Sequence, residues 1–228
     1  ALQQVLQAIH SMDTAALSEC RGLFTISRNV AARLQRYNGL PGTPLYPPPH
    51  HLGRYRSDGH GDYLFYAGRL DRLKRLDLAI DALQRVKSGA KLKIAGAGPL
   101  EVELRKQIEG LGVGDRVELL GFVTADELLG LYARCRAALY VPLNEDYGYV
   151  TVEAMLSRKP VVTTSDAGGP VEFVEDGVTG AVPEPGPEAL AGAIDALWQL
   201  PAARLEQMGR AGEQRVAGIT WDHVIDTL

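Results

Sequence analysis

Short apolar segments alternate with amphipathic segments over most of the chain, and this alternation constrains the fold more than any other feature. The apolar segments predict strands at 62–69, 91–96, 116–121, 137–143, 160–164 and 180–184. Helical spacing of apolar residues predicts helices at 76–86, 100–112, 124–135, 148–158, 169–177, 187–200 and 202–216. Strands that are apolar on both faces and are separated by helices favour an α/β fold with a Rossmann-like, doubly wound parallel sheet of about six strands.

The first 50 residues have a different pattern. Residues 1–38 are predicted to be largely helical, with Ser27 as the N-cap of one helix. The stretch "NGLPGTPLYPPPHH" is rich in Pro and Gly, which predicts an extended linker. We therefore divide the chain into residues 1–50, a sheet domain at 51–217 and a C-terminal helix at 218–228. Since the chain opens "ALQQVLQAIH", in helical pattern and without an initiator Met, we expect a fragment of a longer protein.

Composition excludes few classes of function. The formal net charge is −4, and no basic patch indicates a nucleic-acid partner. Cys20 and Cys135 are the only cysteines and have no metal-ligand spacing, which is typical of reduced thiols in a cytosolic protein. No apolar run approaches the ~18 residues of a membrane span, and no signal peptide is visible.

Ligands of doubly wound sheets bind at the carboxyl ends of the strands, where "GRLDRLKR" follows the first predicted strand. Gly68 permits a close backbone approach there. Arg69 and Lys74 flank the start of a helix, where two cations and free N–H groups could hold a diphosphate. The alternative is a solvated basic face, because Arg72 and Arg75 lie in the same run.

The stretch "AGAGPLE" follows the second predicted strand. Gly96 and Gly98 are present, but Glu101 stands where a dinucleotide-binding fingerprint has its third glycine. The stretch predicts a tight strand-to-helix turn of the kind found in nucleotide-binding folds. Turn formation without ligand contact explains it equally well.

The stretch "EDYGYVTVEAM" carries two glutamates eight residues apart, around the start of a predicted helix. Glu145 falls in the loop, and the N–H groups of Gly148, Tyr149 and Val150 begin the helix with no helical partner. Glu153 lies among apolar residues, where a carboxylate is costly unless it is hydrogen-bonded. It could accept hydrogen bonds from two vicinal hydroxyls of a ligand. The alternative is a glutamate at the rim of the sheet that reaches water.

The stretch "SDAGGPVEFVEDG" predicts a further ligand-facing helix start. Gly168 and Gly169 precede a helix that opens at Pro170, so the N–H groups of that helix start could face an oxygen-rich ligand. Glu172 suits the helix dipole, and plain capping is the alternative. No Ser/His/Asp grouping, HExxH or Asp-x-Asp motif is evident, so we predict no metal site.

These stretches, with "LLGFVTADEL", occur in the order seen in family 4 retaining glycosyltransferases, and the chain resembles the C-terminal domain of their GT-B fold. The resemblance covers roughly residues 60–185. "RGLFTISRNVAARL" resembles the last β–α unit of the family's N-terminal domain, so residues 1–50 would be a remnant of that domain and its linker. "TPLYPPPHH" departs from the Asn-Gly-Val-Asp segment that usually stands there.

The resemblance implies a role for each matched residue. Arg69 and Lys74 match the pair that neutralises the donor diphosphate, Glu153 the acid that binds the ribose, and Glu145 the acid that contacts the donor sugar. The remaining implied donor-binding positions are Gly148, Tyr149 and Val150 for phosphate and sugar, Val123 for the base, and Gly98 in the glycine turn.

The implied function is the donor-binding half of a cytoplasmic hexosyltransferase. It would move a sugar, with retention and without a metal, from a UDP- or GDP-sugar to a glycan or lipid-linked acceptor. The acceptor could lie at the inner membrane face, with any membrane contact made by the protein's own N-terminal domain. Alone, the chain is expected to be inactive. The alternatives are a non-catalytic nucleotide-sugar-binding module, a sugar-nucleotide epimerase or a phosphorylase.

Overall fold

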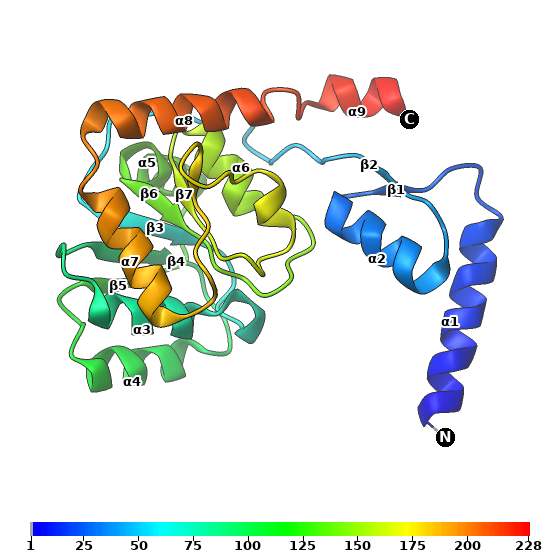
Figure 1. Ribbon diagram of the computed structural model, residues 1–228, viewed down its shortest axis with the longest axis horizontal. Coiled ribbons are helices and arrows are strands. Elements are labelled where there is room, and N and C mark those ends of the chain that lie inside the picture. The colour runs from blue at the N-terminus through cyan, green and yellow to red at the C-terminus, as the bar shows by residue number, and fades with distance from the viewer. Residues whose placement is uncertain (1) are drawn as a thin grey trace.

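A six-stranded parallel sheet forms the centre of the protein, as seen in a computed structural model that describes residues 2–228 (Figure 1). The strand order is β5-β4-β3-β6-β7-β8, and every pair is parallel. The chain therefore runs outward from β3 in one direction and then outward from it in the other, which confirms the doubly wound prediction. The strands are β3 (Tyr63–Ala67), β4 (Lys91–Ala95), β5 (Val117–Gly121), β6 (Ala137–Leu139), β7 (Val161–Val162) and β8 (Gly180–Ala181).

Helices cover both faces of the sheet and bury it completely near β3. Leu64 and Tyr66 of β3 pack into one core, whereas Phe65 and Ala67 pack into the other, because successive side chains of a strand point to opposite faces. The first core contains side chains of α3 (Leu76–Arg85), α4 (Glu101–Leu111) and α7 (Pro187–Trp198). The second contains side chains of α5 (Ala125–Arg134), α6 (Tyr149–Leu156) and α8 (Ala202–Val216).

Several predicted elements are shorter than expected, among them β7 and β8, which have two residues each. The predicted helix 169–177 is only a 3₁₀ turn, η2 (Gly169–Glu172). Thr179 ends it: its hydroxyl accepts from the Glu175 N–H at 2.8 Å and donates to the Phe173 carbonyl at 3.2 Å, which holds the chain in a turn instead of a further helical turn. The predicted strand 137–143 pairs only over β6, and Tyr140–Leu143 form the loop that leads to the site.

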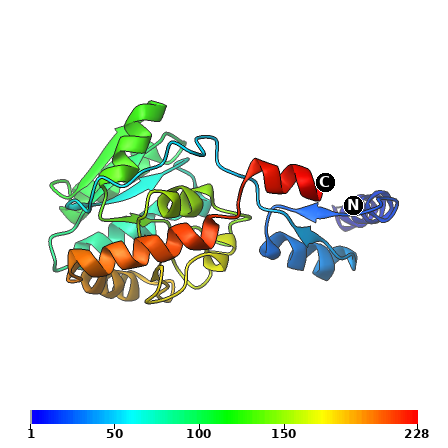
Figure 2. The same ribbon diagram turned by 90° about the horizontal axis from the view of Figure 1, so that it is seen from above.

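The N-terminal part contains α1 (Leu2–Ser18), β1 (Phe24–Thr25), α2 (Arg28–Asn38) and β2 (Thr43–Pro44). The prediction of helix throughout 1–38 is wrong at β1, which pairs in parallel with β2 in a separate two-stranded sheet. The Ser27 cap is confirmed, since its hydroxyl accepts from the Val30 N–H. The last helix, α9 (Trp221–Thr227), leaves the sheet domain toward the same side as the N-terminal part (Figure 2).

Large apolar side chains of these outer elements are exposed. On α1 they form a stripe of Leu2, Val5, Leu6, Ile9 and Met12. Trp221, Ile225 and Leu228, in and just after α9, are exposed as well. None of the helices in residues 2–228 is both long and apolar enough to cross a membrane.

Candidate functional site

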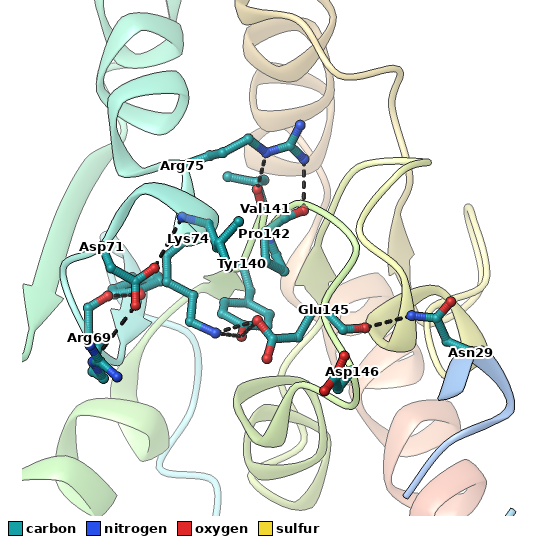
Figure 3. A network of polar contacts seen from close by, with 12 residues as sticks. Asn29, Arg69, Asp71, Lys74, Arg75, Tyr140, Val141, Pro142, Glu145 and Asp146 are labelled. Carbon is teal, nitrogen blue, oxygen red and sulfur yellow. Dashed lines mark hydrogen bonds and ion pairs between the residues drawn. The ribbon is translucent and has the colours of Figure 1, made fainter. Parts of the chain in front are cut away.

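The loop after β3 separates the two predicted phosphate-binding cations. Asp71 caps the 3₁₀ helix η1 (Arg72–Lys74) by accepting from the Leu73 N–H. The Arg69 side chain is 79% exposed, and its guanidinium lies 3.7 Å from the Asp71 carboxylate. Lys74 points the other way, toward the loop after β6 (Figure 3). The structure therefore brings Lys74, but not Arg69, into contact with the other predicted residues.

Lys74 and Glu145 form a partly buried ion pair (Figure 3). Lys74 Nζ contacts Glu145 Oε2, and the two side chains are only 19% and 20% exposed. The Tyr140 hydroxyl donates to the same carboxylate oxygen at 3.0 Å. Because the pair is shielded from water, each charge is held in place by the other more firmly than on an open surface. An anion bound at Lys74 would stand beside Glu145.

A cavity of about 330 Å³ lies where the carboxyl ends of β3 and β4 meet the start of α6. Its walls are Ala67, Gly68, Ala95, Gly96, Phe122, Val123, Leu128, Tyr149, Val150 and Glu153. Four predicted donor-binding residues, Val123, Tyr149, Val150 and Glu153, are therefore gathered in one place. The walls are mostly apolar with one acid, Glu153, among them, an arrangement that suits a flat ring attached to a hydroxyl-bearing group.

Gly98 lies outside this cavity. A Cβ on Gly98 would stand 2.4 Å from the carbonyl oxygen of Leu70, so the residue is glycine because two loops cross there. Gly96, its neighbour in the turn, lines the cavity instead. The donor contact predicted for Gly98 stays a prediction.

Glu153 is held by a buried tyrosine. Burial raises the pKa of the Glu153 carboxyl, and a hydrogen bond from the Tyr132 hydroxyl, at 2.8 Å, acts in the opposite direction. Tyr132 lies on α5 with no exposed surface and packs edge-on against Phe65 at 4.8 Å between ring centroids. Sequence reasoning missed Tyr132, although an aromatic residue on the inward face of a predicted helix was a visible signal.

The start of α6 supplies the free donors that were predicted. Gly148 is the N-cap, with φ of 83°, and its Cβ would stand 2.9 Å from Pro170, so both conformation and space favour glycine. Within residues 2–228 no oxygen accepts from the N–H groups of Gly148, Tyr149 or Val150. These groups can donate to an anionic or oxygen-rich ligand.

The helix start predicted at residues 168–170 does not leave N–H groups free for a ligand as the start of α6 does. The Val171 N–H donates to the Gly168 carbonyl at 3.2 Å, and the Gly169 N–H before it donates to the Glu145 carbonyl at 2.7 Å, so the prediction of free donors is wrong for these groups. Glu172 lies in the first turn of η2, as predicted, but its carboxylate caps the start of α2, a different helix. It accepts from the N–H groups of Arg28 and Asn29, and from the Tyr46 hydroxyl at 2.8 Å.

Arg75 joins the loops behind the site, whereas the sequence predicted for it only a place on a basic face. Its guanidinium donates to the carbonyls of Val141 and Pro142, both at 2.8 Å, and to the Thr164 hydroxyl and Asp166 carboxylate. These bonds join the carboxyl ends of β6 and β7. Its backbone has a φ of 48°, a strained value for a side chain other than glycine. Among residues 2–228, no three His, Cys, Asp or Glu side chains gather as a metal site.

A family model described as "Glycosyl transferases group 1" matches residues 52–215, which include this cavity and the Lys74–Glu145 pair. The chain belongs to this family. Its fold is that of a GT-B C-terminal domain, which confirms the resemblance seen in the sequence.

Curated relatives match over the same part of the chain. Alpha-1,3/1,6-mannosyltransferase ALG2 of Homo sapiens is 31% identical over 169 residues, which cover 67% of this chain and 40% of that protein. Glycogen synthase of Mycobacterium tuberculosis is 36% identical over 157 residues, covering 67% and 37% of the two chains. The chain therefore spans about two fifths of the length of these relatives.

Solved structures share the fold. Anabaena Alr3699/HepE in complex with UDP and glucose has a TM-score of 0.84 and 22% identity, covering 97% of this chain and 65% of that one. Sucrose-phosphate synthase from Thermosynechococcus elongatus has a TM-score of 0.83 and 22% identity, covering 97% and 60%. At 22% identity the similarity shows a shared fold only. Because 97% of this chain is covered, the shared fold includes the N-terminal part.

Proposed function

We propose that the chain is the donor-binding half of a retaining glycosyltransferase that takes a hexose from a UDP- or GDP-sugar. The carrying observation is one cavity lined by Glu153, Val123 and the first residues of α6, whose N–H groups are free among the described residues. The family match and the names of the relatives, a mannosyltransferase and a glycogen synthase, support sugar transfer. A structural neighbour in complex with UDP supports a nucleotide donor.

Each part of the cavity suits one part of such a donor. The apolar wall at Val123 would pack on the base, and Glu153 would accept from the vicinal ribose hydroxyls. The N–H groups of Gly148, Tyr149 and Val150 would donate to phosphate or sugar oxygens. This order places the donor sugar toward the Lys74–Glu145 pair.

Lys74 would then stabilise the charge that grows on the diphosphate as the sugar leaves, a role in which no metal is required. A prepositioned cation lowers the barrier because it needs no reorganisation when the charge develops. Arg69 is exposed enough to swing toward the same phosphates and would add a second cation. Glu145 would bind a sugar hydroxyl.

Acceptor binding and sugar transfer are proposed for a longer protein that includes an N-terminal domain. A glycan or lipid-linked acceptor would bind an N-terminal domain that packs against the exposed apolar stripe of α1 and against α9. We propose a cytoplasmic protein whose N-terminal domain makes any contact with the membrane face. The 228-residue chain alone would bind donor without transferring sugar. Transfer to added glycan or lipid acceptors by this chain would contradict that part of the proposal.

Calorimetric titration of the chain with UDP, GDP, UDP-glucose, UDP-N-acetylglucosamine and GDP-mannose tests the donor site. We expect one nucleotide series to bind, and Lys74→Ala to weaken nucleoside diphosphate binding by at least tenfold, since a hydrogen bond to a charged group contributes about 1.5–3 kcal/mol. Lys106→Ala, which removes an exposed lysine of α4 that does not line the cavity, is the charge-matched control. Glu153→Ala should weaken the ribonucleotide more than its 2′,3′-dideoxy analogue. Absence of binding to every nucleotide, or equal losses for Lys74→Ala and Lys106→Ala, would refute the assignment.

A further inference from the structure

Helix α2, from the N-terminal part, lies against the loop that carries Glu145 (Figures 1 and 3). The Asn29 amide nitrogen donates to the Glu145 carbonyl oxygen at 2.9 Å and to the Asn144 side-chain oxygen at 3.1 Å. Asn29 precedes residues 52–215, which the family model matches. It is therefore a contact to a candidate site residue that the family match does not assign.

The Glu145 backbone is restrained from three directions. Its N–H donates to the Ala167 carbonyl at 2.8 Å, and its carbonyl accepts from the Gly169 N–H at 2.7 Å. Asn29 supplies the second donor to that carbonyl. The first two bonds come from one loop, so only Asn29 ties the backbone of Glu145 to a separate element.

The residue before Glu145 is held by the same amide. Asn144 has a φ of 47°, a left-handed conformation that asparagine adopts more readily than other residues with a side chain. Its side-chain oxygen accepts the Asn29 amide, which favours this conformation. The Asn29 side chain lies so close to the neighbouring loop that a Cβ on Gly168 would stand 2.8 Å from the Asn29 amide nitrogen.

The position of Asn29 is itself well defined. Glu172 accepts from the Arg28 and Asn29 N–H groups at 3.0 and 2.7 Å, so the sheet domain caps the start of α2. One turn further along α2, Arg33 pairs with Asp146. That pair is largely exposed, so it holds α2 in place only weakly.

We propose that Asn29 is a positioning residue for recognition of the donor sugar. Its amide fixes the backbone of 144–145, so that the Glu145 carboxylate, already paired with Lys74, is presented to the hexose of the nucleotide-sugar. The base and the ribose of the nucleotide are bound elsewhere, by the walls of the cavity and Glu153, so most of the nucleotide affinity does not depend on Asn29. This inference rests on the proposed donor-binding function and adds that a residue of the N-terminal part selects for the sugar.

The test compares nucleotide with nucleotide-sugar on the 228-residue chain. Calorimetry is done with UDP and UDP-glucose, and with GDP and GDP-mannose. For each pair, the ratio of the Kd of the nucleotide to the Kd of the nucleotide-sugar is called the sugar factor. Asn29→Asp keeps the shape of the side chain but removes both N–H donors and opposes a carboxylate to the Glu145 carbonyl. We expect it to leave nucleotide affinity within about twofold and to reduce the sugar factor by about tenfold, the loss of one firm hydrogen bond.

Arg33→Gln is the matched control, since it removes the ion pair of the same interface without touching Glu145. We expect it to keep the wild-type sugar factor. Hydrogen exchange of the free chain should show faster exchange at 144–148 for Asn29→Asp only. The inference is overturned if Asn29→Asp keeps the wild-type sugar factor, if Arg33→Gln loses as much, or if the sugar adds nothing to wild-type affinity. A wild-type chain that binds no nucleotide at all would instead refute the proposed function.

Discussion

The hydrogen bond from Tyr132 to Glu153 makes a stability prediction that depends on pH. Tyr132→Phe removes one hydroxyl and leaves the ring, which still packs against Phe65 and Tyr55, so no cavity forms. The bond has a carboxylate as acceptor, and such bonds contribute about 1.5–3 kcal/mol to stability. We expect the free energy of unfolding to fall by this amount at pH 8, measured by urea denaturation.

The sign of the pH dependence follows from the Glu153 carboxyl. Burial raises its pKa in the folded protein, so the folded state takes up a proton before the unfolded state as the pH falls. Tyr132→Phe removes a donor to the ionised form and raises that pKa further. The destabilisation should therefore be largest above the folded pKa and should shrink as the pH falls through it.

Tyr63→Phe provides the comparison. The Tyr63 hydroxyl donates at 2.8 Å to a neutral acceptor, the Leu131 carbonyl, so its removal should cost about 0.5–1.5 kcal/mol at every pH. If the loss caused by Tyr132→Phe is as small as that of Tyr63→Phe, or does not change between pH 8 and pH 5, then Glu153 is not an ionised carboxylate held by Tyr132.

Two further predictions concern the loops behind the site. Arg75→Ala should lower the free energy of unfolding by about 3 kcal/mol or more, since it leaves carbonyls and the Asp166 carboxylate without their donor. Because the Arg75 hydrogen bond lowers the pKa of Asp166, the part of this difference that is due to Asp166 should be present at neutral pH and lost as the pH falls through that lowered pKa, whereas the part that is due to the two carbonyls should remain; a difference that does not shrink in acid would contradict this. Gly98→Ala should be strongly destabilising, because its Cβ would meet the Leu70 backbone, whereas Gly110→Ala, in the open on α4, should stabilise by about 0.5–1 kcal/mol in thermal melts. Equal effects of the two alanines would rule out the crossing of loops at Gly98.

Local chemistry made much of the fold predictable. Ser27 caps α2 as predicted, because the cap depends on a residue only three positions away. The parallel, doubly wound class of the sheet and its six strands followed from the alternation of apolar and amphipathic segments. The loops that carry the site were placed correctly because parallel strands end at one edge.

The contacts within the site could not be obtained in the same way. Four basic residues share the run 69–75, and nothing in that run distinguishes Lys74, which meets Glu145, from Arg75, whose partners are 66–91 residues away. Tyr132 and Glu153 lie on different helices. Asn29 meets Glu145 across 116 residues. Such pairs are set by how the elements pack, which a local pattern does not encode.

The capping of α2 by Glu172 has a consequence for synthesis of the chain. The carboxylate lies 144 residues after the N–H of Arg28 that it binds. At roughly 5–20 residues per second, α2 leaves the ribosome some 7–30 seconds before the residue that completes its first turn. The helix must therefore wait, partly uncapped, until the sheet domain emerges. Ribosome-bound chains that end before Glu172 should accordingly show α2 more open to proteolysis than chains that extend well past it.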